Sequence, residues 1–147
     1  METRNLHTED PRAASAIMKA TSRAKPNRCK KPAYHFILAF DPEDDKAGKI
    51  NPDMMKEIAD KALTRLELQE HQALIYAHQD KDHPHIHFLV NRIHPETGKA
   101  WNRHNEGRRL LEFCGDMARE RGNMTSTFLM TETERRIETK QKSMTLI

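Results

Sequence analysis

The chain has 147 residues, a net charge of +3, and 36% hydrophobic and 32% charged residues, which suits one domain with a small core. It has two cysteines, no apolar run of membrane-spanning length and no signal-peptide pattern at its amino terminus. We therefore expect neither a disulfide scaffold nor a membrane or secreted protein, but a cytoplasmic one.

The first predicted element is a helix from Pro11 to about Ala24. Asp10 is a good N-cap, Pro11 suits the first turn, and Pro26 follows the end of the helix. Residues 12–31 contain seven Lys or Arg and no Asp or Glu. Such a block favours a polyanion such as nucleic acid or an anionic membrane, and a solvated arm explains it equally well.

The segment 32–41, PAYHFILAFD, predicts an interior strand, because its side chains alternate between two largely apolar faces. One face carries Tyr34, Phe36, Leu38 and Phe40, and the other carries His35, Ile37 and Ala39. A strand that is apolar on both sides is typically covered by helices.

A helix is predicted next, from Asn51-Pro52 to about Leu68, after an acidic loop at 41–49. Asn51 is a suitable N-cap, and Pro52 suits the first turn. Apolar residues recur at helical spacing through this segment: Met55, Ile58, Ala59, Ala62 and Leu66.

The rest of the chain predicts strands at 71–79 and 85–93, a turn at 94–99, and a short return strand at 99–103. A helix is predicted from Glu106 to about Arg121, and Gly122 would end it. Its apolar side would be made of Leu110, Leu111, Cys114 and Met117. The sum is an α+β domain, a small antiparallel β-sheet with helices packed on it. We expect this domain to span 1–130 and a charged tail to span 131–147.

The segment from His78 to Trp101 holds five of the nine histidines. His85 and His87 are two residues apart, so a strand presents both rings on one face. His78 ends the preceding strand, and the six residues between it and His85 suit a hairpin loop. Three neutral imidazoles from adjacent strands, with open positions left over, are typical of a catalytic cation site.

The donor set fits a divalent ion such as Mn, Mg or Zn without selecting one. Asp80 and Asp82 are both in the loop between the strands, and either could accept a ring N–H and orient one ligand. Asp80 is the preferred one. The remaining histidines have no such pattern, and we expect ordinary core or surface roles for His7, His35, His71, His83, His94 and His104.

The pattern H-x-D-x-x-H-P-H-x-H-x-x-x-N, from His78 to Asn91, resembles the metal motif of plasmid relaxases, the mobilisation nucleases of the HUH endonuclease class. Flanking segments are also similar to this family, from about residue 5 to about residue 122. The resemblance implies a relaxase-like palm that nicks single-stranded DNA at an origin of transfer during plasmid mobilisation and conjugation, with accessory mobilisation proteins as partners. By position, His78, His85 and His87 would hold the divalent ion, with Asp80 near the site.

In the family a tyrosine attacks the scissile phosphate and leaves a 5′-phosphotyrosyl adduct and a free 3′-OH. That tyrosine lies near the amino terminus, ahead of the segment that METRNL resembles, whereas this chain has only Tyr34 and Tyr76. Tyr34 lies in a core-like strand, and Tyr76 shares a face with His78 and is the candidate nucleophile. The simpler interpretation is a truncated chain without its first strand and its tyrosine, and the exposed sheet edge would then favour a homodimer.

Candidate DNA contacts are basic residues in the loops that flank the strands, because contacts to single-stranded DNA are mostly to phosphates. They are Arg28, Lys30, Lys31, Arg92, Arg103, Arg108 and Arg109. Arg108 and Arg109, at a helix start, are more often plain surface charge. Trp101 could stack on a base, and packing at the edge of the core explains it equally well.

Three functions follow from these observations. The first is metal-dependent nicking and strand transfer of single-stranded DNA. The second is a non-catalytic single-stranded DNA-binding module derived from a relaxase, which the missing tyrosine favours. The third is a metal phosphodiesterase that uses water, with Asp80 or His83 as its base. Whether the chain is an enzyme is open at this point.

Overall fold

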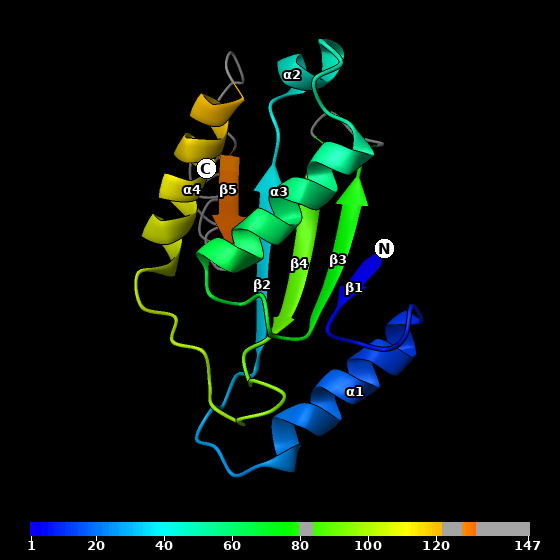
Figure 1. Cartoon of the computed structure of the whole chain (residues 1–147), viewed down its shortest axis with the longest axis vertical. Helices are drawn as coiled ribbons and strands as arrows, with labels where there is room; N and C mark the ends of the chain where they lie inside the picture. The colour runs from blue at the N-terminus through cyan, green and yellow to red at the C-terminus, as the bar shows by residue number, and fades with distance from the viewer. Residues whose placement is uncertain (80–83, 122–127, 132–147) are drawn as a thin grey trace, which may run out of the picture.

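The structure is a computed structural model that describes residues 1–79, 84–121 and 128–131. Its strands and helices form an α+β arrangement (Figure 1). In chain order they are β1 (Glu2–Arg4), α1 (Pro11–Ala24), β2 (Ala33–Ala39), α2 (Pro42–Lys46), α3 (Pro52–Arg65), β3 (Ala73–His78), β4 (His85–Asn91), α4 (Glu106–Glu120) and β5 (Phe128–Thr131).

The strands form one antiparallel sheet in the order β1-β3-β4-β2-β5, which confirms the predicted fold class. β2 lies between β4 and β5, so it is an interior strand as its sequence predicted. β3 and β4 are neighbours, with His78 opposite His85 and Tyr76 opposite His87. This register puts the predicted cation ligands side by side.

Two edge strands and one short helix were not predicted from the sequence. β1 has only three residues and pairs with Ala73, Leu74 and Ile75 of β3. The expectation of an exposed sheet edge is therefore wrong over this part of β3. α2 occupies the acidic loop, where the Asp41 side chain accepts a hydrogen bond from the backbone N–H of Glu43 at 2.8 Å. The predicted tail is not tested, because residues 132–147 lie outside the described part of the chain.

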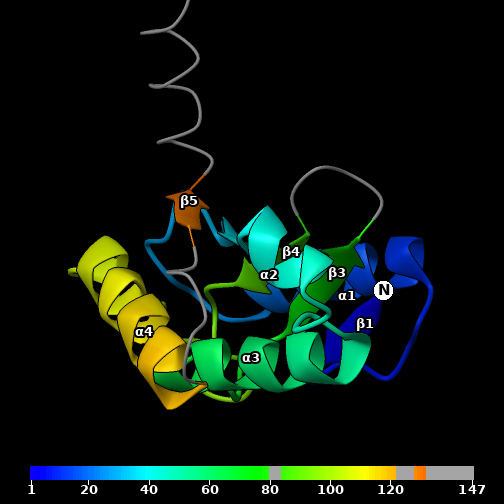
Figure 2. The same cartoon turned by 90° about the horizontal axis from the view of Figure 1, so that it is seen from above.

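The helices cover the two faces of the sheet unequally. Seen from above, α3 and α4 lie along one face and α1 lies on the other (Figure 2). The contacts on the α1 side are made by Ala14, Met18 and Leu74, with Leu6, Tyr76 and Leu89 packed against them. His78, His85 and His87 lie on the same face but are not among the residues of this apolar cluster.

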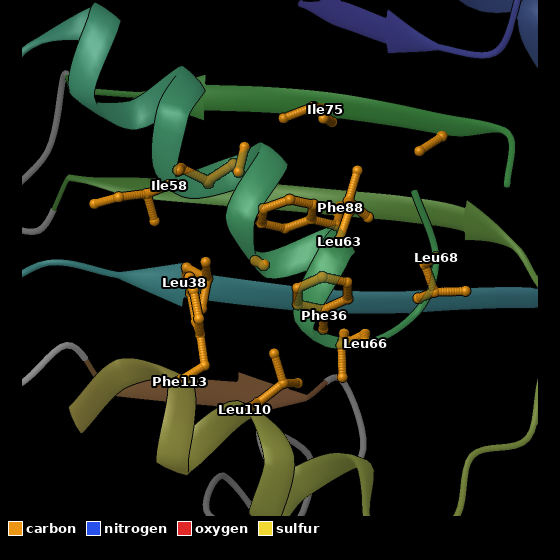
Figure 3. Packing of buried hydrophobic residues seen from close by; sticks show 14 of the residues in the cluster. Phe36, Leu38, Ile58, Leu63, Leu66, Leu68, Ile75, Phe88, Leu110 and Phe113 are labelled. Atoms are coloured by element: carbon orange, nitrogen blue, oxygen red, sulfur yellow. The ribbon is translucent and has the colours of Figure 1, made fainter. Parts of the chain in front are cut away.

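The main core lies between the sheet and the α3–α4 layer (Figure 3). Phe36 of β2 and Phe88 of β4 stack at its centre, with ring centroids 4.2 Å apart and both side chains fully buried. The predicted apolar stripe of α3 is confirmed, since Met55, Ile58, Ala59, Ala62 and Leu66 are all buried.

The predicted apolar side of α4 is partly wrong. Leu111 is 67% exposed, whereas Phe113, which the prediction left out, is buried beside Leu110 (Figure 3). The rotation of α4 about its axis is set by packing against α3 and the sheet, which the sequence of α4 alone does not specify.

Two predicted boundaries also differ. α3 ends at Arg65 rather than near Leu68, because Glu67 takes a left-handed φ of 60° and turns Leu68 into the core. The predicted return strand at 99–103 is reduced to a single bridge between Ile93 and Ala100.

The buried Asn91 side chain links α1 to the sheet. Its Nδ2 donates to the carbonyl of Met18 at 3.0 Å and to Gln72 Oε1 at 3.1 Å, and its Oδ1 accepts from the backbone N–H of Ile93 at 3.0 Å. Removing this amide would leave several buried polar groups without this hydrogen-bond partner, each at a cost of about 1–3 kcal/mol.

We therefore expect Asn91→Ala to lower the free energy of unfolding by at least about 2 kcal/mol, and to speed hydrogen exchange in α1 more than in α3. Urea unfolding followed by circular dichroism, together with amide exchange, would measure both. The conservative control is Asn102→Ala at an exposed position, for which the curve should not shift. Equal stability of the Asn91 and Asn102 variants would contradict the assigned link.

Of the helices in the described part of the chain, none has the length and apolarity needed to cross a membrane.

Candidate metal centre

The candidate metal centre is built by the register of two strands. His78 and His85 are directly opposite each other on β3 and β4, and His87 is two residues further along β4. Directly opposite residues share one face of a sheet, as do residues two apart on one strand. All three side chains therefore project from the face opposite the main core, whose contacts on β4 come from Ile86 and Phe88.

The three imidazoles converge as the sequence predicted. The ring centroids of His78 and His85 are 5.0 Å apart, those of His85 and His87 are 4.8 Å apart, and those of His78 and His87 are 5.5 Å apart. One nitrogen from each ring lies within 4.8 Å of the others. Nitrogens on one cation lie no more than about 4.2 Å apart, since each bond is about 2.1 Å long. Small side-chain rotations would close the site around an ion.

The surroundings of these rings suit a reactive rather than a sealed site. His78 is exposed, whereas His85 and His87 are half-buried. Sheet backbone therefore lies beneath the nitrogens, and solvent reaches them from the other side. A site with three protein ligands and open positions leaves room for a substrate oxygen on the cation.

Tyr76 lies next to the centre, opposite His87 on the neighbouring strand. Its ring is half-buried and packs against the apolar cluster that Ala14 and Met18 of α1 form with Leu74. The sequence prediction that Tyr76 shares a face with His78 agrees with this position. The contact with α1 gives the ring a packing role as well.

Asp80, the predicted orienting carboxylate, and His83 both belong to the segment 80–83, which is outside the described residues. Tyr34 is 3% exposed and stacks on Phe36 in the core, as its strand pattern predicted. Its burial is consistent with a packing role.

A second feature of the surface is an open basic groove lined by the loops at the other end of the sheet. It has a volume of about 910 Å³. Six cationic side chains and no acidic ones are among its described lining residues: Arg28, Lys30, Lys31, Arg92, Lys99 and Arg103. All of them except Lys99 are predicted DNA contacts, so the structure brings five of the predicted contacts together. Arg108 and Arg109 are not among the described lining residues. β4 runs from the histidines toward this groove, and its seven residues separate the two features by about 20 Å.

The cations of the groove differ in how firmly they are held. Arg92 donates to the carbonyls of Lys31 and Trp101, each at 3.1 Å, and so ties two loops together. Arg103 forms an ion pair with Glu106, whose carboxylate raises the pKa of the Arg103 guanidinium. Lys30 and Lys31 are both exposed and lie on the same loop. Their ammonium groups are therefore accessible to a phosphate.

Trp101 is buried, whereas stacking on a base requires an exposed ring. It is 7% exposed, lies beside Tyr34 with centroids 5.0 Å apart, and its indole N–H donates to the carbonyl of Leu66 at 2.7 Å. The burial favours the packing alternative that the sequence allowed.

His35 is a functional candidate that the sequence analysis assigned to an ordinary role. Its Nε2 lies 3.2 Å from Nδ1 of His87. The sequence held one indication of this role. His35 is two residues from Ile37 and so lies on the same face of its strand, and Ile37 pairs with His87. That signal has meaning only once β2 is known to lie beside β4.

Comparison with known proteins decides the family. The family model described as "Relaxase: MobA/VirD2-like, nuclease domain" matches residues 1–123. The chain belongs to this relaxase family. The resemblance seen in the histidine motif is thereby confirmed over most of the chain.

Several curated relatives support the assignment of this relaxase domain. It is 30% identical to Protein TraI of Escherichia coli over 108 residues, which are 73% of this chain and 13% of TraI. It is 32% identical to Protein rlx of Staphylococcus aureus over 96 residues, which are 61% of this chain and 27% of rlx. It is 30% identical to Protein MobA of Acidithiobacillus ferrooxidans over 73 residues, which are 50% of this chain and 17% of MobA.

The relaxase domain therefore spans between 13% and 27% of the lengths of these relatives. No solved structure matches the chain.

Proposed function

We propose that this relaxase domain nicks and rejoins single-stranded DNA at a plasmid origin of transfer with the help of a divalent cation. The observation that carries the proposal is the convergence of three imidazoles, from His78, His85 and His87, on one open face of the sheet. Family membership over residues 1–123 supports a nuclease role for this face.

A bound cation would act as a Lewis acid on the scissile phosphate and as a template for its oxygens. The chain contributes three neutral ligands, which leave the positive charge of the ion undiminished. A covalent step by a tyrosine would form one P–O bond and break another, with the phenol losing its proton and the 3′ oxygen gaining one. The number of phosphodiester bonds is unchanged, so the strand could be rejoined later.

The attacking tyrosine has two candidate sources. Tyr76 is adjacent to His87, but its packing against the cluster of Ala14, Met18 and Leu74 would have to loosen for its phenol to reach a phosphate. The other source is polypeptide on the amino-terminal side of Met1. Because Glu2 pairs with Ile75, a strand that continued β1 in that direction would run alongside Tyr76 and His78, toward the centre. We favour this second source.

A non-catalytic module that binds single-stranded DNA is the second candidate function. The observation that favours it is the packed ring of Tyr76. The third function, cleavage by a water molecule, depends on Asp80 or His83, both in the segment 80–83 outside the described residues.

The reaction products separate these functions. End-labelled oligonucleotides from the transfer origin would be incubated with the protein and Mn²⁺ and then separated on a denaturing gel. We expect the 147-residue chain to bind DNA with little adduct, and a chain extended through any in-frame codons before Met1 to form a protein-linked adduct. An adduct from the shorter chain that disappears in Tyr76→Phe would contradict the upstream source, and cleavage without adduct would indicate water.

The basic groove should supply the salt-dependent part of DNA binding. We expect Lys30→Ala with Lys31→Ala to reduce the slope of log K against log salt by about 0.7 for each phosphate that these lysines neutralise. Fluorescence anisotropy of a labelled single strand at several salt concentrations would measure the slope. The control is Lys61→Ala on α3, which pairs with Glu57 and is not among the described lining residues of the groove. An equal reduction of the slope in the control would count against the groove.

A further inference from the structure

His35 of β2 contacts one of the predicted cation ligands from a neighbouring strand. We propose that His35 is a positioning residue that holds the ring of His87 in the orientation and tautomer needed to bind the cation. This inference rests on the metal-dependent function proposed above and adds a member to its site.

The contact between the two rings has the geometry of a hydrogen bond in the ring plane. His35 Nε2 and His87 Nδ1 are 3.2 Å apart. The ring planes are parallel within 3°, and the centroids are 5.4 Å apart. The centroid separation is close to the nitrogen–nitrogen distance plus the two centre-to-nitrogen distances of the rings. The two nitrogens therefore lie nearly on the line that joins the ring centres, so the rings meet edge to edge.

The strand register explains why these residues meet. On the pair β2–β4, His87 is opposite Ile37, and His35 is opposite Leu89. His35 is thus the diagonal neighbour of His87 on the same face, at a separation that long side chains bridge. Apolar side chains at Ile37 and Leu89 flank the contact, and a polar ring in such surroundings is stable when it is hydrogen-bonded.

The contact assigns a role to each nitrogen of His87. A neutral imidazole has one N–H donor and one acceptor nitrogen. If Nδ1 of His87 carries the proton and donates it to His35, then Nε2 of His87 is the nitrogen with the lone pair for the cation. Metal-binding histidines generally donate their other N–H to a fixed acceptor, which orients the ring and makes the ligating nitrogen more basic.

His35 itself does not belong to the ligand set. The group whose nitrogens lie within 4.8 Å of one another comprises His78, His85 and His87 among the described residues. The nitrogen of His35 that comes near the site is Nε2, and it contacts Nδ1 of His87. Its action would therefore pass through His87.

An imidazole acceptor has a different electrostatic effect from the carboxylate that often fills this position. It orients the ring without adding negative charge next to the cation. With three neutral ligands and a neutral acceptor, the ion would keep its full charge for the phosphate oxygens, which is the charge that Lewis-acid activation uses.

The experiment compares two substitutions of His35 in the full chain. His35→Phe keeps a ring of similar size and removes the acceptor. His35→Gln keeps an acceptor near the position of Nε2. His104→Phe removes an exposed histidine from the chain and is the matched control. Thermal unfolding would report whether each variant is folded.

Calorimetric titration with Mn²⁺ gives the first readout. We expect His35→Phe to weaken Mn²⁺ binding by about 10- to 100-fold, and His35→Gln and His104→Phe to stay close to the unchanged protein. The second readout needs no metal, because nitrogen NMR shifts of the His87 ring report which nitrogen carries the proton. We expect the Nδ1–H form in the unchanged protein and in His35→Gln, and a mixture in His35→Phe.

Equal Mn²⁺ affinity of His35→Phe and the unchanged protein would overturn the inference and leave the proposed function intact. An Nε2–H tautomer of His87 in the unchanged protein would also overturn it, whatever the affinities. If the unchanged protein binds no Mn²⁺, the proposed function fails together with this inference. Should His35→Phe not fold, the His35→Gln affinity and the His87 tautomer of the unchanged protein still decide the question.

Discussion

Replacing His85 and His87 together by alanine is expected to abolish binding of Mn²⁺ and, with it, every DNA cleavage product. Both residues come from one strand and supply two of the three converging nitrogens. One remaining imidazole, His78, would hold a divalent ion no better than a surface histidine does. Calorimetry and elemental analysis after dialysis against Mn²⁺ would measure the loss.

The fold should tolerate this change, because both side chains are only half-buried and point away from the main core. The matched control is His71→Ala together with His94→Ala, which removes two imidazoles that contact each other near Asn91, away from the centre. That control should retain Mn²⁺ binding. Unchanged metal content in the His85 and His87 variant would show that the centre is wrongly assigned.

The second large effect is expected from Phe88→Ala at the centre of the core. Phe88 is fully buried, stacks on Phe36 with centroids 4.2 Å apart, and lies under α3 (Figure 3). Truncating a buried phenylalanine removes its transfer free energy and leaves a cavity, at a combined cost of about 3–5 kcal/mol. Domains of this kind are stable by only about 5–15 kcal/mol, so the variant should approach or cross its unfolding threshold.

Urea unfolding followed by circular dichroism would measure this destabilisation. Leu111→Ala is the control, because this leucine is 67% exposed although it lies in the amphipathic helix α4. Its midpoint should stay within the small range typical of surface substitutions. A Phe88→Ala midpoint close to that of Leu111→Ala would contradict the assignment of the core.

Because Phe88 and His87 are adjacent on β4, the same strand serves the core with one face and the candidate centre with the other. The Phe88 variant should therefore lose Mn²⁺ binding through loss of the fold. In the His85 and His87 variant, binding should be lost while the fold remains. Measuring both properties in both variants separates the two causes.

Much of this architecture was predictable from local sequence. The period-2 alternation in β2 and β4 predicted which side chains share a face of each strand, because alternate residues of a strand always point to opposite sides. Helix starts were also predictable, since Asp10 and Asn51 cap α1 and α3 through hydrogen bonds to the backbone N–H groups of Ala13 and Met54. These signals depend on residues close together in the chain.

The parts that were missed depend on contacts between distant residues. β1 and β5 have three and four residues, too few for a periodic pattern, and they exist as strands only because β3 and β2 offer edges to pair with. The exposure of Leu111 follows from how α4 packs on its neighbours, and the burial of Trp101 follows from its hydrogen bond to the distant Leu66.

The sequence by itself predicted that His78, His85 and His87 come together, because the spacing of His85 and His87 and the short connection to His78 leave little freedom in how the three side chains are arranged. The tertiary structure decided the surroundings of those ligands. Only the placement of β2 beside β4 brings His35 to His87, and only the folding of two separate loops gathers Lys30, Lys31 and Arg92 into one groove. The physical reason is sequence separation: strand order and loop packing are set by the whole core, whereas strand parity is set by the backbone of each strand.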